Sequence, residues 1–158
     1  GADMSGRLAD PVIRGSVRAQ NARLESAVTG TILTNLQDHR AEARSEQLKA
    51  VGIDAPVFTN QGPKGDALAR IKAEYQPSVT VFIDDMSGHH ESVNEISPDV
   101  WRLHMIGEPL MARHFEPAPF AHARIDHWDA AHIWIEEKLT AGAPAPKINL
   151  PKIELETA

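Results

Sequence analysis

The chain has 158 residues, of which 42% are hydrophobic and 24% charged, and it contains no cysteine. A chain of this length is expected to form one domain, whose core is large enough to fold without disulfide bonds. The absence of cysteine excludes a disulfide framework, thiolate metal sites and cysteine nucleophiles. The formal net charge of −6 argues against a general nucleic-acid binder, because Lys and Arg must neutralise the phosphates of such a partner.

The hydropathy of the chain also argues against a membrane protein. No stretch approaches the roughly 18 consecutive apolar residues of a membrane-spanning helix. The first residues lack the basic start and apolar core of a signal peptide. We therefore expect a cytoplasmic protein with no membrane or nucleic-acid partner, and the oligomeric state stays open.

Short β-branched and apolar runs alternate with runs of helix-forming residues along the chain. Such alternation predicts an α/β protein with a parallel sheet and helices on both of its faces. The expected strands are 28–34, 55–58, 79–83, 100–106 and 123–125, and the expected helices are 37–50, 66–75, 89–96 and 129–139. We expect 1–139 to form one core domain and the Ala- and Pro-containing segment 140–158 to be a tail or a strap across the surface.

Polar residues follow the expected strands at the positions where ligands bind in open parallel sheets. Thr34 and Asn35 end one strand, Lys64 lies in the next connection, and Asp84 and Asp85 follow the most apolar strand. Two adjacent carboxylates repel unless a cation or hydrogen-bond donors compensate them. Carboxylates and water are the ligands that Mg²⁺ prefers, and an ammonium beside them suits a phosphoryl group.

Each of these features also has an ordinary structural interpretation. Thr34 and Asn35 are typical of a turn or a helix cap, and Lys64 in a Pro-Lys-Gly turn is typical of a solvated lysine. One of the two aspartates is able to cap the following helix. The order and spacing of all three features together are more specific than any one of them.

Three segments resemble motifs two, three and four of the haloacid dehalogenase superfamily: Ile32–Asn35, Gly62–Gly65 and Val81–Asp85. The resemblance covers roughly 10–106, and its intervals are typical of the phosphatase-like members. The segment Val12–Val17, followed by a helix leading into the Thr34 strand, also resembles the entry to the core of this family.

The resemblance implies a three-layer Rossmann-like core, Mg²⁺ dependence and hydrolysis of a small phosphorylated metabolite through an aspartyl-phosphate. It places Thr34, with Asn35 beside it, on the phosphate, and Lys64 on both the nucleophile and the phosphate. It places Asp84 and Asp85 around the metal.

The chain departs from the family at the first motif, an apolar strand ending in Asp-x-Asp-Gly-Thr whose first Asp is the nucleophile. The local candidate is Asp3, but Ser5 replaces the general acid/base and Arg7 replaces the Thr. Only Gly1 and Ala2 precede Asp3, so this sequence has no room for the expected central strand ahead of Asp3. The catalytic strand, and with it a cap insertion, is then expected upstream of residue 1.

Two alternatives to a complete phosphatase follow from this departure. The chain is either a haloacid-dehalogenase-like module that has lost its nucleophile motif and binds a ligand or a partner protein, or a receiver-like phospho-acceptor domain. The receiver interpretation is disfavoured, because in receivers the paired acids come early in the chain, whereas Asp84 and Asp85 come late.

The eight histidines do not show a metal-binding pattern. His89 and His90 are adjacent, so on a helix they point about 100° apart and do not readily share an ion, although they are close enough to Asp85 to line a pocket mouth. His122, His127 and His132 are spaced by five rather than by three or four. The histidines are expected to be surface or capping residues, and the three tryptophans are expected to pack in the core.

Overall fold

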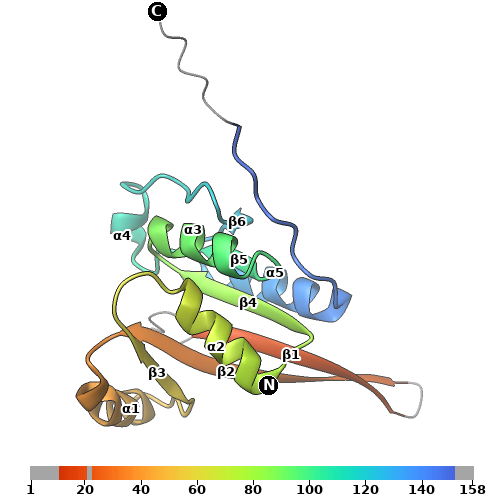
Figure 1. The fold of residues 1–158 in the computed structure, drawn as a ribbon, viewed down its shortest axis with the longest axis horizontal. Helices are drawn as coiled ribbons and strands as arrows, with labels where there is room; N and C mark the ends of the chain where they lie inside the picture. Colours follow the sequence, from red (N-terminus) through yellow and green to blue (C-terminus); the bar gives the residue numbers. More distant parts are fainter. Residues whose placement is uncertain (1–10, 21–22, 152–158) are drawn as a thin grey trace, which may run out of the picture.

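The computed structural model describes residues 11–20 and 23–151, with side-chain surroundings from residue 28 onward. Strands and helices alternate along most of this part, so the chain is an α/β protein (Figure 1). In chain order the elements are β1 (Pro11–Gln20), β2 (Arg23–Asn35), the 3-10 helix η1 (Asp38–Arg40), α1 (Ala41–Ala50), β3 (Val57–Asn60), α2 (Gly65–Tyr75), β4 (Val79–Asp84), α3 (Ser87–Ile96), β5 (Trp101–His104), α4 (Pro109–Ala112), β6 (Ala123–Arg124) and α5 (Trp128–Ala141).

In the described part of the chain the strands form one mixed sheet, in the order β3-β2-β1-β4-β5-β6. β2 pairs parallel with β3, and β5 pairs parallel with both β4 and β6. β1 lies between β2 and β4 and runs antiparallel to both. The expectation of a wholly parallel sheet is therefore wrong at the centre of the sheet.

A β-hairpin replaces the helix that was expected between Val17 and Val28. The β1–β2 ladder runs from Pro11 opposite Ile32 to Gln20 opposite Arg23. A connection of two residues joins antiparallel strands but is too short for a parallel crossover, and this fixes the direction of β1. Residues 18–25 are mostly helix formers (Arg, Ala, Gln, Leu and Glu), so here the pairing between strands overrides local propensity.

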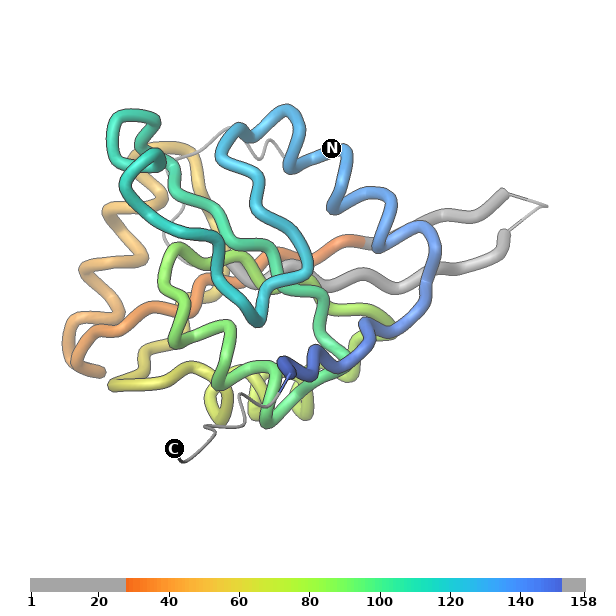
Figure 2. Tube along the Cα trace, turned by 90° about the horizontal axis from the view of Figure 1, so that it is seen from above, coloured from red at the N-terminus to blue at the C-terminus, as the bar shows by residue number. Residues whose placement is uncertain are grey.

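Helices cover both faces of the sheet, because alternate residues of β4 pack into different core clusters. Phe82 packs in one cluster with side chains of α2 and α3, including Leu68 and Val93. Val81 and Ile83 pack in the other cluster, with side chains of α5. Successive side chains of a strand point to opposite faces, so α2 and α3 lie on one side of β4 and α5 lies on the other (Figures 1 and 2).

The other predicted helices and strands are confirmed, with shifted ends. The closing helix α5 begins at Trp128, one residue before its expected start, and Asp129 lies in its first turn. The short helix α4 was not predicted. The three tryptophans pack partly buried against the α5 side of the core, as expected. None of the helices in the described residues is long and apolar enough to cross a membrane.

The segment that follows α5 crosses the surface as a strap, which we define as residues 143–148. Its backbone bonds to three parts of the protein: the carbonyl of Ala143 accepts from the Trp101 indole (2.9 Å), the amide of Ala145 donates to the carbonyl of Asp99 (2.9 Å), and Ile148 bonds twice to the Asn94 side chain (both 2.9 Å). Of the two forms expected for this segment, a tail or a strap, the structure shows the strap over residues 143–148.

Two isoleucines of different exposure test the position of the core. Ile71 on α2 is 2% exposed and Ile133 on α5 is 63% exposed. Ile71→Ala is expected to lower the free energy of unfolding by about 2–5 kcal/mol, because it removes packed methyl groups and leaves a cavity. Ile133→Ala makes the same chemical change at the surface and is expected to alter it by less than about 0.5 kcal/mol. Urea unfolding of both variants measures the difference, and equal losses would contradict the placement of α2 against the sheet.

Candidate functional site

The predicted site residues converge on one edge of the sheet. β2 and β4 run in the same direction, each antiparallel to β1 between them, so their carboxyl ends reach the same edge. Asn35 ends β2 and Asp84 ends β4, while β1 begins at this edge with Pro11 opposite Ile32. Asp3, the candidate nucleophile, lies outside the described residues.

Lys64 and Asp84 form a buried ion pair at this edge. Nζ of Lys64 lies 2.8 Å from Oδ2 of Asp84, and the two side chains are 1% and 0% exposed. The second carboxylate oxygen, Oδ1, accepts a hydrogen bond from the amide of Met86 at 2.7 Å. Both oxygens of Asp84 therefore have partners, and the carboxylate holds the ammonium in one position.

A glycine allows α2 to begin close enough to α3 to seat Lys64. The amide of Gly65 donates to Oγ of Ser92 at 3.0 Å. A Cβ at residue 65 would lie 2.5 Å from the carbonyl oxygen of Ser92, which is too close for any side chain. The glycine that follows Lys64 thus keeps the start of α2, and with it the ion pair, against α3.

Asn35 and Asn60 hold the turn that leads to Lys64. Nδ2 of Asn35 donates to the carbonyl of Gly62 at 3.1 Å, and Nδ2 of Asn60 lies within 3.1 Å of Oδ1 of Asn35 and of the carbonyls of Gly62 and Pro63. Gly62 has a positive φ of 90°, which an L side chain rarely adopts. Asn35 therefore anchors the turn before Lys64, a contact that the sequence did not predict.

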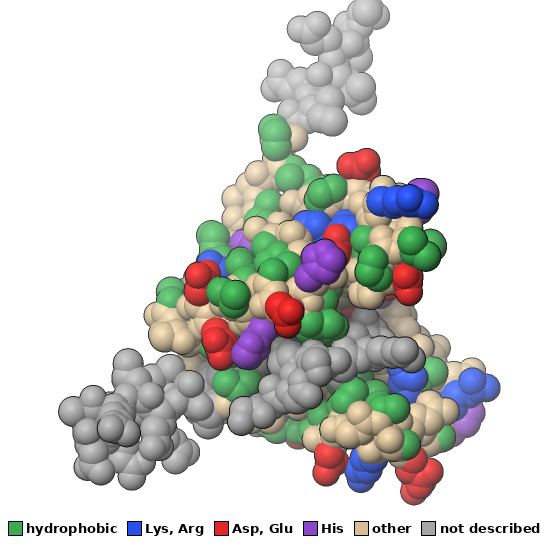
Figure 3. All heavy atoms as spheres, turned by 180° about the vertical axis from the view of Figure 1, so that it is seen from behind, with side chains coloured by type: hydrophobic (Ala, Val, Ile, Leu, Met, Phe, Trp, Pro, Cys, Tyr) green, Lys and Arg blue, Asp and Glu red, His purple; other side chains and the backbone are tan. Residues whose placement is uncertain are grey.

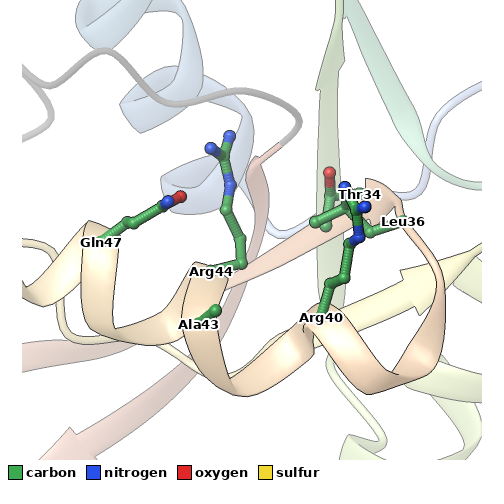
Figure 4. A pocket seen from close by; sticks show the side chains of 6 residues that line it. All are labelled: Thr34, Leu36, Arg40, Ala43, Arg44 and Gln47. Carbon is green, nitrogen blue, oxygen red and sulfur yellow. The ribbon is translucent and has the colours of Figure 1, made fainter.

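Thr34 points to the opposite face of the sheet from Asp84. Leu33 packs in the same cluster as Phe82, which is two residues before Asp84 on β4. Since side chains alternate along a strand, Leu33 and Asp84 share one face and Thr34 points to the other. There Thr34 lines a cavity whose wall also includes Arg40 of η1 and Arg44 of α1 (Figure 4). Of the predicted site residues, Lys64 and Asp84 are in direct contact at this edge, whereas the Thr34 side chain lies in the cavity on the opposite face of the sheet.

The described residues do not fit a magnesium ion as they stand. Both oxygens of Asp84 are engaged and its side chain is fully enclosed, whereas Asp85 is exposed. In the part of the chain that the structure describes, no group of three or more His, Asp or Glu side chains is placed to hold a metal. Two carboxylates, one of them already paired, leave the donor set for a metal incomplete.

Two buried histidines fix the backbone of the acidic pair. Nε2 of His90 lies 3.0 Å from the carbonyl oxygen of Asp84, and Nε2 of His104 lies 3.0 Å from that of Asp85. A carbonyl only accepts, so Nε2 carries the proton in both rings. Nδ1 of His104 in turn accepts from the amide of Ala118 at 2.9 Å, which makes this ring neutral.

The two rings pack edge to face, with centroids 5.5 Å apart. Burial lowers the pKa of His90 to about 3 and also lowers the pKa of His104. The expectation of surface or capping histidines is therefore wrong for these two. The signal available in the sequence was that His90 lies three residues before Val93 on one helical face, and that His104 shares a face of the expected strand 100–106 with Val100 and Ile106.

Comparison of the chain with protein-family models, curated proteins and solved structures finds no match.

The buried ion pair is tested by removing one partner. Lys64→Met leaves the Asp84 carboxylate buried without its counter-charge, and about 3–5 kcal/mol of stability is expected to be lost. Lys49→Met is the matched control, because Lys49 also pairs with an aspartate but at 3.9 Å and in an exposed position. That control is expected to cost less than about 1 kcal/mol. Similar losses in urea unfolding would show that the Lys64 pair is solvated.

The neutral histidines predict a loss of stability in mild acid. His90 has a pKa of about 3 in the folded protein and an ordinary value near 6.5 in the unfolded chain. Between these values the unfolded chain binds a proton that the folded protein does not, so stability falls as the pH drops below about 6.5. At pH 5 the loss from His90 is about 2 kcal/mol relative to neutral pH.

Urea unfolding at pH 7.5 and pH 5 measures this dependence. His90→Gln keeps a donor for the Asp84 carbonyl without a titratable ring, and it is expected to remove the part of the dependence that His90 contributes. His104, whose pKa is also lowered by burial, keeps its own part. A variant that loses as much stability in acid as the parent would assign the effect to other groups.

Proposed function

We propose that the chain is a haloacid-dehalogenase-like phosphohydrolase core, with the three-layer Rossmann-like arrangement of that superfamily, acting on a small phosphorylated metabolite. One observation carries the proposal: the Lys64–Asp84 pair is buried at the carboxyl edge of the sheet, where α/β proteins bind ligands. The motif-like segments around Thr34, Lys64 and Asp84 also follow the family order along the chain.

In this proposal Lys64 supplies the positive charge that offsets a phosphoryl group. Asp84 orients the ammonium at 2.8 Å, and Asn35 and Asn60 fix the turn that carries Lys64. A charge that is held in place before the ligand arrives needs no reorganisation during reaction, which is the source of its effect on the transition state. The attacking aspartate is proposed to come from an Asp-x-Asp strand, for which Asp3 is the local candidate.

Magnesium dependence and an aspartyl-phosphate intermediate belong to the proposal through the family resemblance alone. When bound, the ion would supply charge neutralisation at the phosphoryl oxygens. Asp85, which follows the paired Asp84 and is exposed, has a carboxylate open to solvent for such a ligand.

One observation favours a second function, a non-catalytic module that binds a ligand or partner with the same fold. β1 lies in the middle of the sheet, between the Thr34 and Asp84 strands, and runs antiparallel to both. Its carboxyl end at Gln20 therefore points away from the Lys64–Asp84 edge. A nucleophile at the end of the strand in this position would not face Lys64.

The test is a panel of phosphomonoesters assayed with and without Mg²⁺, using the 158-residue chain and any longer product of its gene. The proposal predicts turnover with Mg²⁺ that is lost in Lys64→Met and retained in Lys49→Met, at temperatures where both variants are folded. Absence of turnover from every form under every condition would leave the binding module as the better function.

Thermal unfolding checks the metal independently of turnover. If Asp84 and Asp85 hold Mg²⁺, the ion is expected to raise the melting temperature of the parent and to raise that of Asp85→Asn much less. Equal responses of the two proteins would contradict the assignment of Asp85 to a metal.

A further inference from the structure

A cavity of about 420 Å³ lies between the end of β2 and the start of α1, on the opposite face of the sheet from the Lys64–Asp84 pair. Among the described residues, two arginines line it and no acidic residue does. The lining residues are Thr34, Leu36, Arg40, Ala43, Arg44 and Gln47 (Figure 4). The volume lies in the range of small-molecule sites, which is about 300–1,000 Å³.

The polar residues of the cavity lie on one face of the helix that follows β2. Arg40, Arg44 and Gln47 are spaced by four and three residues, which brings them to the same side of a helix. Figure 4 shows the side chains of Arg40 and Arg44 extending to the same side of the helical segment, with the Gln47 amide directed toward Arg44. Thr34 enters the cavity from β2.

Within the described residues, no ion pair or hydrogen bond engages the side chain of either arginine. Nε of Arg44 is buried and has no hydrogen-bond partner. In the described part of the chain, none of the salt bridges involves Arg40 or Arg44. A guanidinium has five N–H donors and keeps its charge at any physiological pH, so it requires acceptors when it is withdrawn from water. Arg44 is half-buried and Arg40 is exposed, so this demand falls mainly on Arg44. The two positive charges lie at one cavity without a carboxylate paired to either among the described residues.

We propose that this cavity binds a phosphoryl group, either free phosphate or the phosphate end of a small ester. A dianion matches two guanidinium charges, and tetrahedral oxygens accept paired N–H bonds from arginine forks. The Thr34 hydroxyl and the Gln47 amide supply further donors from the other sides of the cavity. The site is separate from the Lys64–Asp84 pair and does not depend on the proposed hydrolysis.

Isothermal titration of the whole chain with inorganic phosphate, sulfate and acetate, at constant ionic strength, tests the proposal. Phosphate and sulfate are expected to bind and acetate to bind much more weakly, because a carboxylate has a single charge and only two oxygens. Glycerol phosphate, titrated in parallel, identifies the source: tighter binding than inorganic phosphate indicates an ester, and weaker binding indicates the free ion. Acetate binding as tightly as phosphate would overturn the proposal.

Variants locate the anion. Arg44→Ala is expected to weaken phosphate binding by roughly 10- to 100-fold, as loss of a charge-assisted bond implies. The double variant with Arg40→Ala is expected to abolish binding in the measurable range. Lys49→Ala removes one positive charge from the same helix without lining the cavity, and it is expected to change the affinity by less than about twofold. Melting temperatures without anion confirm that each variant is folded.

The outcome separates this site from the proposed catalytic edge. Phosphate binding that survives the double arginine variant, and is lost in Lys64→Met, would place the anion at the Lys64–Asp84 pair and overturn the proposal. Binding that falls in the arginine variants supports it, whether or not the protein hydrolyses any ester.

Discussion

The ion pair between Lys64 and Asp84 is the interaction on which the edge of the sheet depends. Two charges removed from water are tolerated only with close geometry and with their remaining hydrogen-bonding atoms satisfied. The amide of Met86 satisfies the second carboxylate oxygen of Asp84. Two further contacts fix the backbone around the pair: the Gly65–Ser92 bond holds α2 against α3, and the His90 ring bonds the carbonyl of Asp84. The positions of α2, α3 and the end of β4 are therefore coupled through one carboxylate.

The direction of β1 divides the polar residues of this edge into two groups. An antiparallel strand begins where its neighbours end, so no third carboxyl end lies between those of β2 and β4. Asp84 faces the side of α2 and α3, while Thr34 faces the side of η1 and α1, which carry Arg40 and Arg44. The edge thus carries positive charge on both faces of the sheet, balanced by a carboxylate on one of them.

The sequence predicted the local elements well, because β4 is apolar throughout and α2 follows a clear turn at Gly62 and Pro63. It also placed Lys64 and Asp84 at one edge, since parallel strands end together. It did not predict the hairpin, because residues 18–25 have helical propensity and only pairing over the whole ladder decides against it. The sequence also did not show that Thr34 and Asp84 lie on opposite faces of the sheet, because the face to which a side chain points depends on how each strand packs against its neighbours. The burial of His90 and His104 likewise depends on the contact between α3 and β5.

The strap has a consequence for the order in which the protein is made. Oδ1 of Asn94 accepts both from the buried guanidinium of Arg102, at 2.6 Å, and from the amide of Ile148, at 2.9 Å. Asn94 therefore completes its bonding only with a residue 54 positions later in the chain. During synthesis the hydrogen bonds between Asn94 and Ile148 form only after residue 148 has left the ribosome. Until then the Asn94 carboxamide, which also bonds Arg102, is open to water on the side that the strap later covers. The entropic cost of closing this segment grows only slowly with its length. The long separation between Asn94 and Ile148 therefore affects when the contact forms more than how stable it is.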